Sequence, residues 1–293
     1  MRIWLNAARP RTLPAAIAPV LVGTAAAVYM AGHLPRLGGF LAALVASVLI
    51  QIGTNLANDY SDARRGADST DRLGPVRVTS AGLVTPRRVL VATWLAFGLS
   101  LVLGLYLAWL AGPVILVVGV LSIAAGVLYT GGPKPYGYAG LGEVFVFLFF
   151  GLVAVNGAFY VQLEELEILP LGLSISVGFL ATAILVVNNV RDMDTDRRAN
   201  KITLAVRIGR AWARRLYSGL MIGSFVVLIA TLVVESGPWW GLLGLLALPL
   251  ARGPLVAVNT HTDGPTLNKC LAQSGAVLGV FALFTSIGLV IAA

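Results

Sequence analysis

Uninterrupted apolar runs of about twenty residues recur from Thr12 to the end of the chain. A helix needs about 20 apolar residues to cross the bilayer's hydrocarbon, which is roughly 30 Å thick. In lipid the backbone polar groups must be bonded within the protein, and runs of this length favour helices. Because 58% of the 293 residues are hydrophobic and only 12% are charged, a single soluble domain is excluded. The sequence therefore predicts an all-α polytopic membrane protein.

Charged, proline and glycine residues divide the apolar sequence into nine predicted transmembrane helices. Their approximate ranges are 12–31, 38–58, 88–111, 113–130, 141–161, 169–190, 213–234, 238–257 and 271–291. The arginine-bearing segment before them leads into a long span followed by further spans, so we expect a retained first helix and no cleaved signal peptide. We expect one domain over residues 1–293.

The basic residues lie almost entirely on one side of this arrangement. If the N-terminus is inside, the cytoplasmic segments hold every Lys and Arg except Arg36. Acidic residues mark the other side, namely Glu164, Glu165, Glu167 and Glu235. The net charge of +8 is spread over short loops and forms no basic patch or stripe, which argues against nucleic acid as a partner. We expect a multi-pass protein of the plasma (inner) membrane, with its N-terminus inside and no obligate protein partner.

Cysteine and histidine chemistry has no support in this sequence. Cys270 is the only cysteine, so an internal disulfide is impossible, and neither a Cys-x-x-Cys motif nor a histidine cluster is present. His261 and Asp263 lie in a Thr/Gly/Pro-bearing stretch without the spacing of metal ligands, and we interpret them as loop residues.

Two Asn/Asp-rich segments share one order of residues. The first, 55–68, reads NLANDYSDARRGAD, and the second, 188–201, reads NNVRDMDTDRRANK. Each begins with Asn-x-x-x-Asp, continues with further Asp and then Arg-Arg, and lies at the cytoplasmic end of an even-numbered predicted span. The match suggests two related halves. We refer to them below as the first and second acidic segments.

Helical geometry gives these segments a chemical meaning. If the helix continues, Asn55, Asp59 and Asp62 share one face. The second segment offers an equivalent face of Asn188, Asp192 and Asp196. Like charges at this spacing destabilise a helix by roughly 0.2–0.5 kcal/mol per pair, so a cation is expected between them. Oxygen ligands favour Mg²⁺, which proteins hold with few carboxylates while water and phosphate complete its coordination.

Two opposed faces of this kind predict a diphosphate substrate bound through Mg²⁺. The alternative is that the aspartates are solvated helix ends paired with neighbouring arginines.

A Gly/Pro-rich turn, 129–143 (YTGGPKPYGYAGLGE), follows the fourth predicted span on the same side. Its only cation, Lys134, is a compact charge suited to phosphate oxygens, or else a snorkelling lysine that sets topology. Tyr129, Tyr136 and Tyr138 are candidates for substrate contact or for an interfacial aromatic belt. Glu143 is a functional candidate at the membrane surface, or a cap of the next helix.

Together these motifs resemble the UbiA superfamily of intramembrane aromatic prenyltransferases, most closely its MenA family, the 1,4-dihydroxy-2-naphthoate polyprenyltransferases. The resemblance covers nearly the whole chain. It rests on ARPRTL at 8–13, NDYSD at 58–62 with Gly66-Ala-Asp68, YTGGP at 129–133 with GLGE at 140–143, and the second acidic segment with KITLAV at 201–206. It implies nine helices around a central cavity that is capped by cytoplasmic loops and opens laterally to lipid.

The resemblance implies Mg²⁺-dependent transfer of a polyprenyl group from polyprenyl diphosphate to 1,4-dihydroxy-2-naphthoate. Loss of the ring carboxylate as CO₂ would give demethylmenaquinol in menaquinone biosynthesis. The alternatives within the superfamily are 4-hydroxybenzoate, homogentisate or a porphyrin-derived acceptor, or a phytyl donor.

An alternative from another class is a cation-coupled transporter, since paired acids on broken helices also mark ion sites near the midplane. Here the acids lie at helix ends, which argues against transport. A CDP-alcohol phosphotransferase is excluded because its Asp-Gly-x-x-Ala-Arg signature is absent.

The resemblance also implies roles for individual residues. The implied metal ligands are Asp59, Asp62, Asp192 and Asp196. The step from Asp59 to Asp62 is three residues, where many superfamily members have four, so either Asp62 or Asp68 completes the first metal shell.

Asp59, Asp192 and Lys134 are the implied catalytic residues, and Lys134 and Arg191 would neutralise the leaving diphosphate. The residues expected to bind diphosphate or acceptor are Asn55, Asn58, Arg64, Asp68, Tyr129, Tyr138, Asn188, Arg191 and Lys201. Arg9 and Arg11 either contact an acidic acceptor or set topology.

Overall fold

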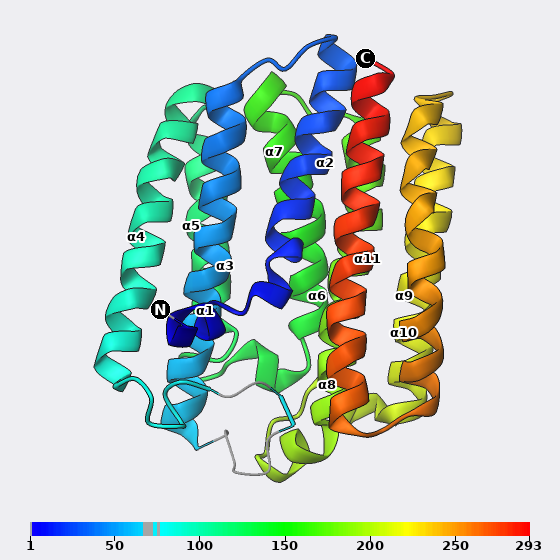
Figure 1. Cartoon of the computed structure of the whole chain (residues 1–293). Coiled ribbons are helices and arrows are strands. Elements are labelled where there is room, and N and C mark those ends of the chain that lie inside the picture. Colours follow the sequence, from blue (N-terminus) through cyan, green and yellow to red (C-terminus); the bar gives the residue numbers. More distant parts are fainter. Residues whose placement is uncertain (1, 67–72, 75–76) are drawn as a thin grey trace.

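The computed structural model describes residues 2–66, 73–74 and 77–293. Within these residues the elements are helices joined by loops, and no strand is present. Figure 1 shows the long helices standing side by side along one direction, with the short α1 lying across their lower half. The all-helical prediction is confirmed for the described residues.

The elements follow one another in the order of the predicted spans. Before the first long helix lie α1 (Arg2–Ala8) and the single turn η1 (Pro10–Thr12). The long helices are α2 (Pro14–Ala31), α3 (Leu37–Arg65), α4 (Pro86–Ala111), α5 (Pro113–Leu128), α8 (Ile168–Arg198), α9 (Leu204–Val234) and α11 (Gly264–Ile291). Two further rods are composite: α6 (Gly142–Val146), the π-helix η3 (Phe147–Val153) and α7 (Ala154–Leu163), then η4 (Trp239–Ala247) and α10 (Leu248–Thr260).

Within the described residues, eight helical segments are long and apolar enough to cross a membrane. They coincide with eight of the nine predicted ranges. The remaining range, 113–130, is helical as α5, which is shorter at 16 residues. The ninth span and the cytoplasmic N-terminus stay predictions.

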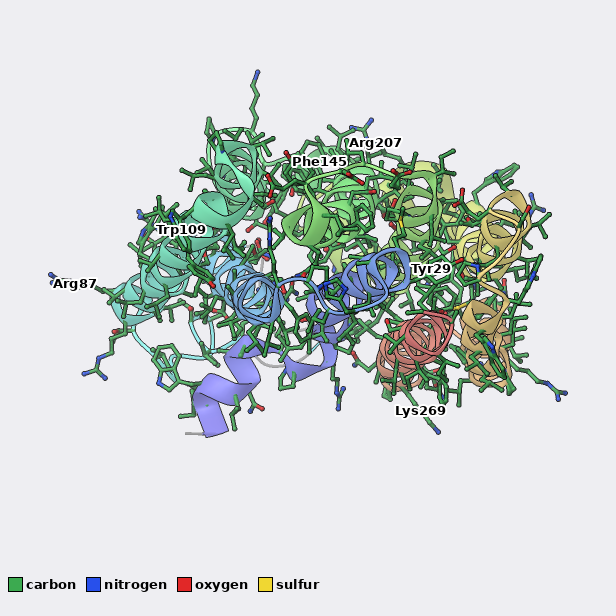
Figure 2. All side chains as sticks on the ribbon, turned by 90° about the horizontal axis from the view of Figure 1, so that it is seen from above. Tyr29, Arg87, Trp109, Phe145, Arg207 and Lys269 are labelled. Atoms are coloured by element: carbon green, nitrogen blue, oxygen red, sulfur yellow. The ribbon has the colours of Figure 1, made fainter. Side chains whose placement is uncertain are left out.

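The apolar surface of the bundle is distributed as lipid would require. On α4, the side chains of Leu95, Val102 and Trp109 are 62%, 62% and 79% exposed. Contiguous apolar faces of this kind are costly in water, whereas hydrocarbon covers them without penalty. In contrast, α8 is mostly buried and packs against α9 and α11. Viewed along the helices, charged side chains such as Arg87, Arg207 and Lys269 lie at the periphery (Figure 2).

Glycines allow the inner helices to approach closely. A Cβ atom added at Gly151 of η3 would lie 2.6 Å from Gly178 Cα on α8. One added at Gly23 of α2 would lie 2.1 Å from the Val155 carbonyl oxygen on α7. Without a hydrophobic drive between helices in lipid, such backbone contact supplies the packing energy. These crossings fix the η3–α7 rod against α2 and α8.

Arg36, the one cation predicted on the outer side, ties three helix ends together. Its Nη1 donates to the carbonyl oxygens of Leu110, near the end of α4, at 2.9 Å and of Val161, near the end of α7, at 3.0 Å. Its other terminal nitrogen pairs with Glu164. Helix C-termini favour positive charge, so this residue stabilises the bundle and is compensated locally.

Within the described residues, most of each acidic segment continues a transmembrane helix, as predicted. The first lies at the end of α3, which ends at Arg65, where Gly66 adopts φ 65° and caps it. The second lies at the end of α8, which runs to Arg198. Both ends lie at the bottom of the bundle in Figure 1, opposite the C-terminus. The fold therefore places the two segments at one end of the molecule.

Candidate active site

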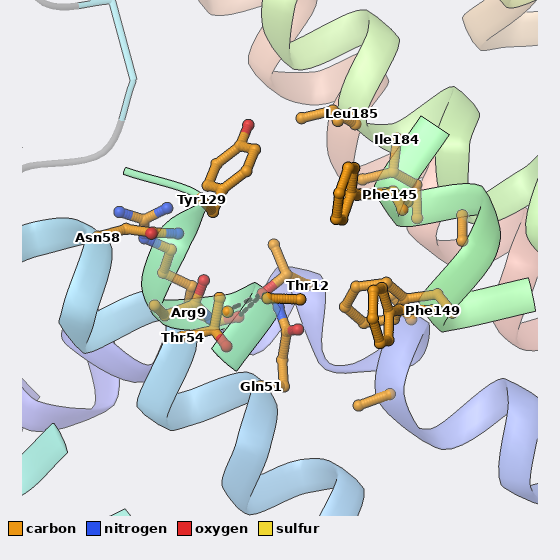
Figure 3. A pocket seen from close by; sticks show the side chains of 18 of the residues that line it. Arg9, Thr12, Gln51, Thr54, Asn58, Tyr129, Phe145, Phe149, Ile184 and Leu185 are labelled. Atoms are coloured by element: carbon orange, nitrogen blue, oxygen red, sulfur yellow. Dashed lines mark hydrogen bonds between the residues drawn. The ribbon is translucent and has the colours of Figure 1, made fainter. Parts of the chain in front are cut away.

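A cavity of about 250 Å³ opens between the ends of α3 and α8. Its two walls differ in character (Figure 3). The first wall carries polar side chains that include Arg9, Thr12, Gln51, Thr54 and Asn58, and across the cavity lie Phe145, Phe149, Ile184 and Leu185. The cavity can therefore hold a molecule with a charged group at one end and a hydrocarbon body.

Residues of both acidic segments meet in this cavity. The predicted site residues that line it are Asn55, Asn58, Asp62, Tyr129, Asn188, Asp192 and Lys201. Other predicted residues, although described, lie outside the lining: Asp59, Arg64, Lys134, Tyr138, Arg191 and Asp196. Asp68 lies outside the described residues. The structure thus brings seven of the fourteen predicted side chains together in one cavity, from segments far apart in sequence.

Asp59 anchors the loop that follows the first acidic segment. Its two carboxylate oxygens accept hydrogen bonds from the backbone N–H groups of Val78 and Thr79, both at 3.0 Å. The residue is buried. Asp59 therefore holds the loop against the end of α3 from just outside the cavity.

Asp62 lines the cavity, and its carboxylate accepts hydrogen bonds from two side chains that the sequence analysis did not pair with it. Arg77 Nη2 donates to Asp62 Oδ2 at 2.8 Å, and the Tyr138 hydroxyl donates to Oδ1 at 2.9 Å. Arg77 is buried and lines the cavity. The sequence did not predict this role for Arg77, because a single arginine in a long loop belongs to no periodic pattern. The pair places a positive charge beside the first acidic segment.

On α8, Arg191 lies outside the cavity lining and bonds to two residues that belong to it, Asp192 and Asn188. Its Nε and Nη2 donate to the two oxygens of Asp192 at 2.8 and 2.6 Å. Nη2 also donates to Asn188 Oδ1 at 2.8 Å. Such bidentate pairing fixes a carboxylate in direction as well as in position. Arg191 therefore orients Asp192 toward the cavity.

Lys201 supplies an ammonium group at the mouth. Its Nζ lies 3.4 Å from Asp196 Oδ1 and 5.6 Å from the centre of the Tyr138 ring. Asp196 Oδ2 is buried and has no hydrogen-bond partner among the described residues. Lys134, in contrast, is exposed. Lys201 is thus the lysine that the fold places in the cavity.

Aromatic rings form a continuous row along the apolar wall. Tyr136 stacks on Phe145 with ring centres 4.0 Å apart, and Phe145 lies 6.1 Å from Phe149. Tyr129 meets the edge of Tyr136 at 5.4 Å. Phe149 belongs to the π-helix η3, a distortion that often occurs at functional sites. The row leads from the polar mouth into the apolar interior.

Tyr129 lines the cavity directly after α5, and its carbonyl oxygen accepts a hydrogen bond from the Gly137 backbone N–H at 2.9 Å. Glu143 is buried behind the lining, where its Oε1 accepts from Asn189 Nδ2 at 2.9 Å. The turn after α5 therefore contributes both a lining side chain and a buried carboxylate next to the cavity.

Other residues also line the cavity, and their contacts could not be predicted from their spacing in the sequence. The Thr130 hydroxyl donates to Asn58 Oδ1 at 2.8 Å. Thr12 accepts from the amide nitrogens of both Gln51 and Asn55 at 3.1 Å. Arg9 lines the cavity from the left-handed backbone conformation, φ 53°. The N-terminal segment is thus part of the polar wall.

Divalent metal binding is chemically compatible with this donor set. Within the described residues, no three Asp, Glu, His or Cys side chains gather closely enough to form a metal site by themselves. The acidic side chains around the mouth, Asp62, Asp192 and Asp196, supply oxygen only, and Asp196 has an unsatisfied buried oxygen. Mg²⁺ is commonly held by one or two carboxylates, with substrate phosphate and water completing its coordination. The residues therefore fit a metal that arrives with a phosphorylated substrate.

Comparison with known proteins gives consistent matches. The model of the UbiA prenyltransferase family matches residues 16–291. The 1,4-dihydroxy-2-naphthoate octaprenyltransferase of Mycobacterium tuberculosis is 46% identical over 280 residues, which cover 96% of this chain and 94% of that protein. The protein of the same name from Escherichia coli is 42% identical over 289 residues, which cover 94% and 91%.

Among solved structures, a UbiA homolog from Archaeoglobus fulgidus bound to GPP and Mg²⁺ superposes with a TM-score of 0.69. The two chains are 16% identical, and the match covers 99% of each. At this identity the likeness establishes the fold.

Proposed function

The chain belongs to the UbiA prenyltransferase family, and we propose that it transfers a polyprenyl group from polyprenyl diphosphate to 1,4-dihydroxy-2-naphthoate. The resemblance seen in the sequence motifs is confirmed, and the transporter alternative is set aside. The observation that carries the proposal is the cavity, which joins a charged mouth to an aromatic interior, in a chain 46% identical to a naphthoate octaprenyltransferase. The chain is a multi-pass membrane protein. We place it in the plasma membrane with the mouth facing the cytoplasm.

The donor diphosphate would lie at the mouth. Of the four predicted metal ligands, Asp62, Asp192 and Asp196 would hold Mg²⁺, which when bound supplies positive charge to the departing diphosphate. We leave out Asp59 because both of its carboxylate oxygens accept backbone N–H groups outside the cavity. Arg77 and Lys201 line the mouth and would contact phosphate oxygens directly. We assign to Lys201 the phosphate contact that the resemblance implied for Lys134, because Lys134 is exposed.

Cleavage of the allylic C–O bond would release diphosphate and leave an allylic cation. The row from Tyr136 to Phe149 would exclude water from that cation, and its rings would stabilise the charge. The electron-rich acceptor ring then forms the new C–C bond. Departure of its carboxyl carbon as CO₂ returns the bonding electron pair to the ring and restores the hydroquinone.

The proposed acceptor is a carboxylic acid, and the polar wall of the cavity contains an arginine that could bind its carboxylate. Arg9 lines the cavity beside Gln51 and Asn55, whose amide groups are held by Thr12. Arg11 does not belong to the lining. Of the two arginines considered in the sequence, Arg9 is therefore the candidate for the naphthoate carboxylate.

The donor's hydrocarbon tail requires more room than the cavity offers. A volume of about 250 Å³ is too small for a polyprenyl chain together with a naphthoate. The tail would therefore continue from the aromatic interior into the surrounding lipid, which suits a bundle with an apolar outer surface.

The direct test is an assay of purified protein with 1,4-dihydroxy-2-naphthoate, prenyl diphosphates of several lengths and Mg²⁺. We expect a prenylated naphthoquinol and one equivalent of CO₂. Chelation should abolish turnover, and added Mg²⁺ should restore it. Product formed from 4-hydroxybenzoate or homogentisate, with none from the naphthoate, would contradict the acceptor and keep the family chemistry.

A further inference from the structure

Arg191 is a buried cation whose donors are directed to three partners. Two partners, Asp192 and Asn188, line the cavity on its own helix. The third is Asn268 on α11, whose Oδ1 accepts from Arg191 Nη1 at 2.6 Å. The Arg191 side chain is 1% exposed, so water cannot replace a lost partner. Asn268 therefore completes the hydrogen bonding of the residue that orients Asp192.

The orientation of the Asn268 amide is fixed by its two contacts. While its oxygen accepts from Arg191, its Nδ2 donates to the Leu73 carbonyl oxygen at 2.7 Å. Reversing the amide would set donor against donor and acceptor against acceptor. Leu73 follows the first acidic segment in the chain, and its side chain lies against Gly264 at the start of α11. One amide thus joins the second acidic segment, and the loop that follows the first, to the last helix.

We propose that Asn268 is a positioning residue of the prenyl-transfer site. It holds the Arg191 guanidinium in the plane that chelates Asp192, and so keeps the Asp192 carboxylate directed at the donor diphosphate. This inference rests on the proposed function. No substrate contact is assigned to Asn268 itself, which is not part of the cavity lining.

Loss of the amide leaves a buried positive donor without an acceptor. Charge-assisted hydrogen bonds to a guanidinium are short and strong, and an unpaired donor in a buried position is costly. The guanidinium would turn toward another acceptor and carry Asp192 with it. The effect should therefore appear in the chemical step more than in acceptor binding.

The fold does not depend on this contact. On either side of Asn268, the apolar residues Leu267, Cys270 and Leu271 are buried and attach α11 to the bundle. Asn268 itself is only partly buried, at the end of the helix nearest the acidic segments. A leucine has the same branched side-chain shape as asparagine and opens no cavity at this position.

The first experiment compares Asn268→Leu, Asn268→Asp and the control Asn259→Leu in the naphthoate assay. Asn259 is exposed on α10 and bonds to Ser218 and to its own helix, so its replacement changes no cavity contact. We expect Asn268→Leu to lower kcat about tenfold or more. The KM for the acceptor should stay within about threefold, and Asn268→Asp, which keeps an oxygen for Arg191, should recover most of the loss. Equal kcat values for Asn268→Leu and Asn259→Leu would overturn the proposal.

A double-mutant cycle with Arg191→Ala supplies a readout that a purely structural role would not move. If Asn268 acts through Arg191, then Asn268→Leu should have little further effect on kcat in the Arg191→Ala background. Additive losses would overturn the proposal. Thermal unfolding of each variant identifies any that fail to fold, and the Asn268→Asp comparison remains decisive in that case.

Binding separates this inference from the proposed acceptor. Titration of wild type and Asn268→Leu with geranyl thiolodiphosphate plus Mg²⁺ needs no acceptor. Weaker binding of about tenfold in the variant supports positioning even if the naphthoate assay fails. Equal affinity together with equal turnover refutes the positioning role while leaving the transferase activity intact.

Discussion

At the scale of single residues, Asp192 and Asp194 form a matched pair on one helix. Asp192 lines the cavity and is held by Arg191 at 2.6 Å. Asp194 lies two residues away with a side chain that is 68% exposed, and it meets Arg210 at 3.0 Å. Both are aspartates of α8, but one lies in the cavity and the other in solvent. Comparing variants of the two therefore measures how much the position in the cavity contributes to activity.

We predict that Asp192→Asn lowers kcat about 100-fold or more, because an oriented carboxylate at the site of charge separation is lost. Asp194→Asn should leave kcat within about twofold, since an exposed ion pair contributes little. Both variants should elute and melt like the wild type. Steady-state turnover at saturating substrates measures the difference, and similar kcat values for the two variants would remove Asp192 from the mechanism.

The two lysines offer a second comparison at this scale. Lys201 lies in the mouth beside Asp196, whereas Lys134 is exposed on the turn after α5. We predict that Lys201→Ala weakens donor binding and lowers kcat/KM for the diphosphate about tenfold or more, through loss of a charged phosphate contact. Lys134→Ala should stay within about threefold of wild type. The reverse order of effects would restore Lys134 to the catalytic role.

Helical spacing predicted the Asn and Asp side chains of α3 and α8 that line the cavity, and it missed partners that come from other elements. Asn55 and Asp62 recur on one helical face, so their convergence could be inferred from sequence. Arg77 lines the cavity from a loop. Asn268, outside the lining, contacts Arg191 from a helix more than 70 residues further along the chain. A hydrogen bond between residues so far apart cannot be predicted from the pattern of residues in a single sequence.

At the scale of elements, the crossing of η3 and α8 depends on the absence of side chains. A Cβ atom on Gly151 would meet Gly178 Cα at 2.6 Å and the Ser174 carbonyl oxygen at 2.8 Å, both backbone atoms. A Cβ atom on Gly157 of α7 meets nothing within 4 Å. The two glycines lie six residues apart in one rod.

We predict that Gly151→Ala destabilises the bundle by about 1–3 kcal/mol, because the helices must separate. Gly157→Ala should be neutral or stabilising by up to about 1 kcal/mol, since alanine is the better helix former. Thermal unfolding in detergent compares the two variants. An unchanged Tm for Gly151→Ala would show that the crossing can relax.

Apolar run length predicted where the helices lie but not how they turn. The runs that form α4 and α8 are similarly apolar, yet α4 is largely exposed and α8 is largely buried. In lipid both the outer and the inner faces are apolar, so hydropathy does not separate them. The π-helical turn at Phe147–Val153 was also beyond prediction, because its sequence is an ordinary apolar run. Helix positions follow from composition, whereas rotation and distortion follow from packing.

At the scale of the whole molecule, charge is divided between the two ends of the bundle. The end that carries the acidic segments also carries most of the arginines and lysines, while Glu164, Glu165 and Glu167 lie at the other end around Arg36. A cytoplasmic preference for basic residues would place the cavity mouth inside the cell.

Maleimide labelling of single introduced cysteines tests this orientation, because the native Cys270 should not react and so should add no label of its own. Cys270 is 1% exposed and should not react with a bulky maleimide. A cysteine at exposed Lys134 reports the cavity end, and one at exposed Glu165 reports the other end. In intact spheroplasts, a membrane-impermeant maleimide should label Glu165→Cys and leave Lys134→Cys unlabelled. Both should react after permeabilisation, and the opposite pattern in intact spheroplasts would invert the molecule and place the diphosphate site on the outer face.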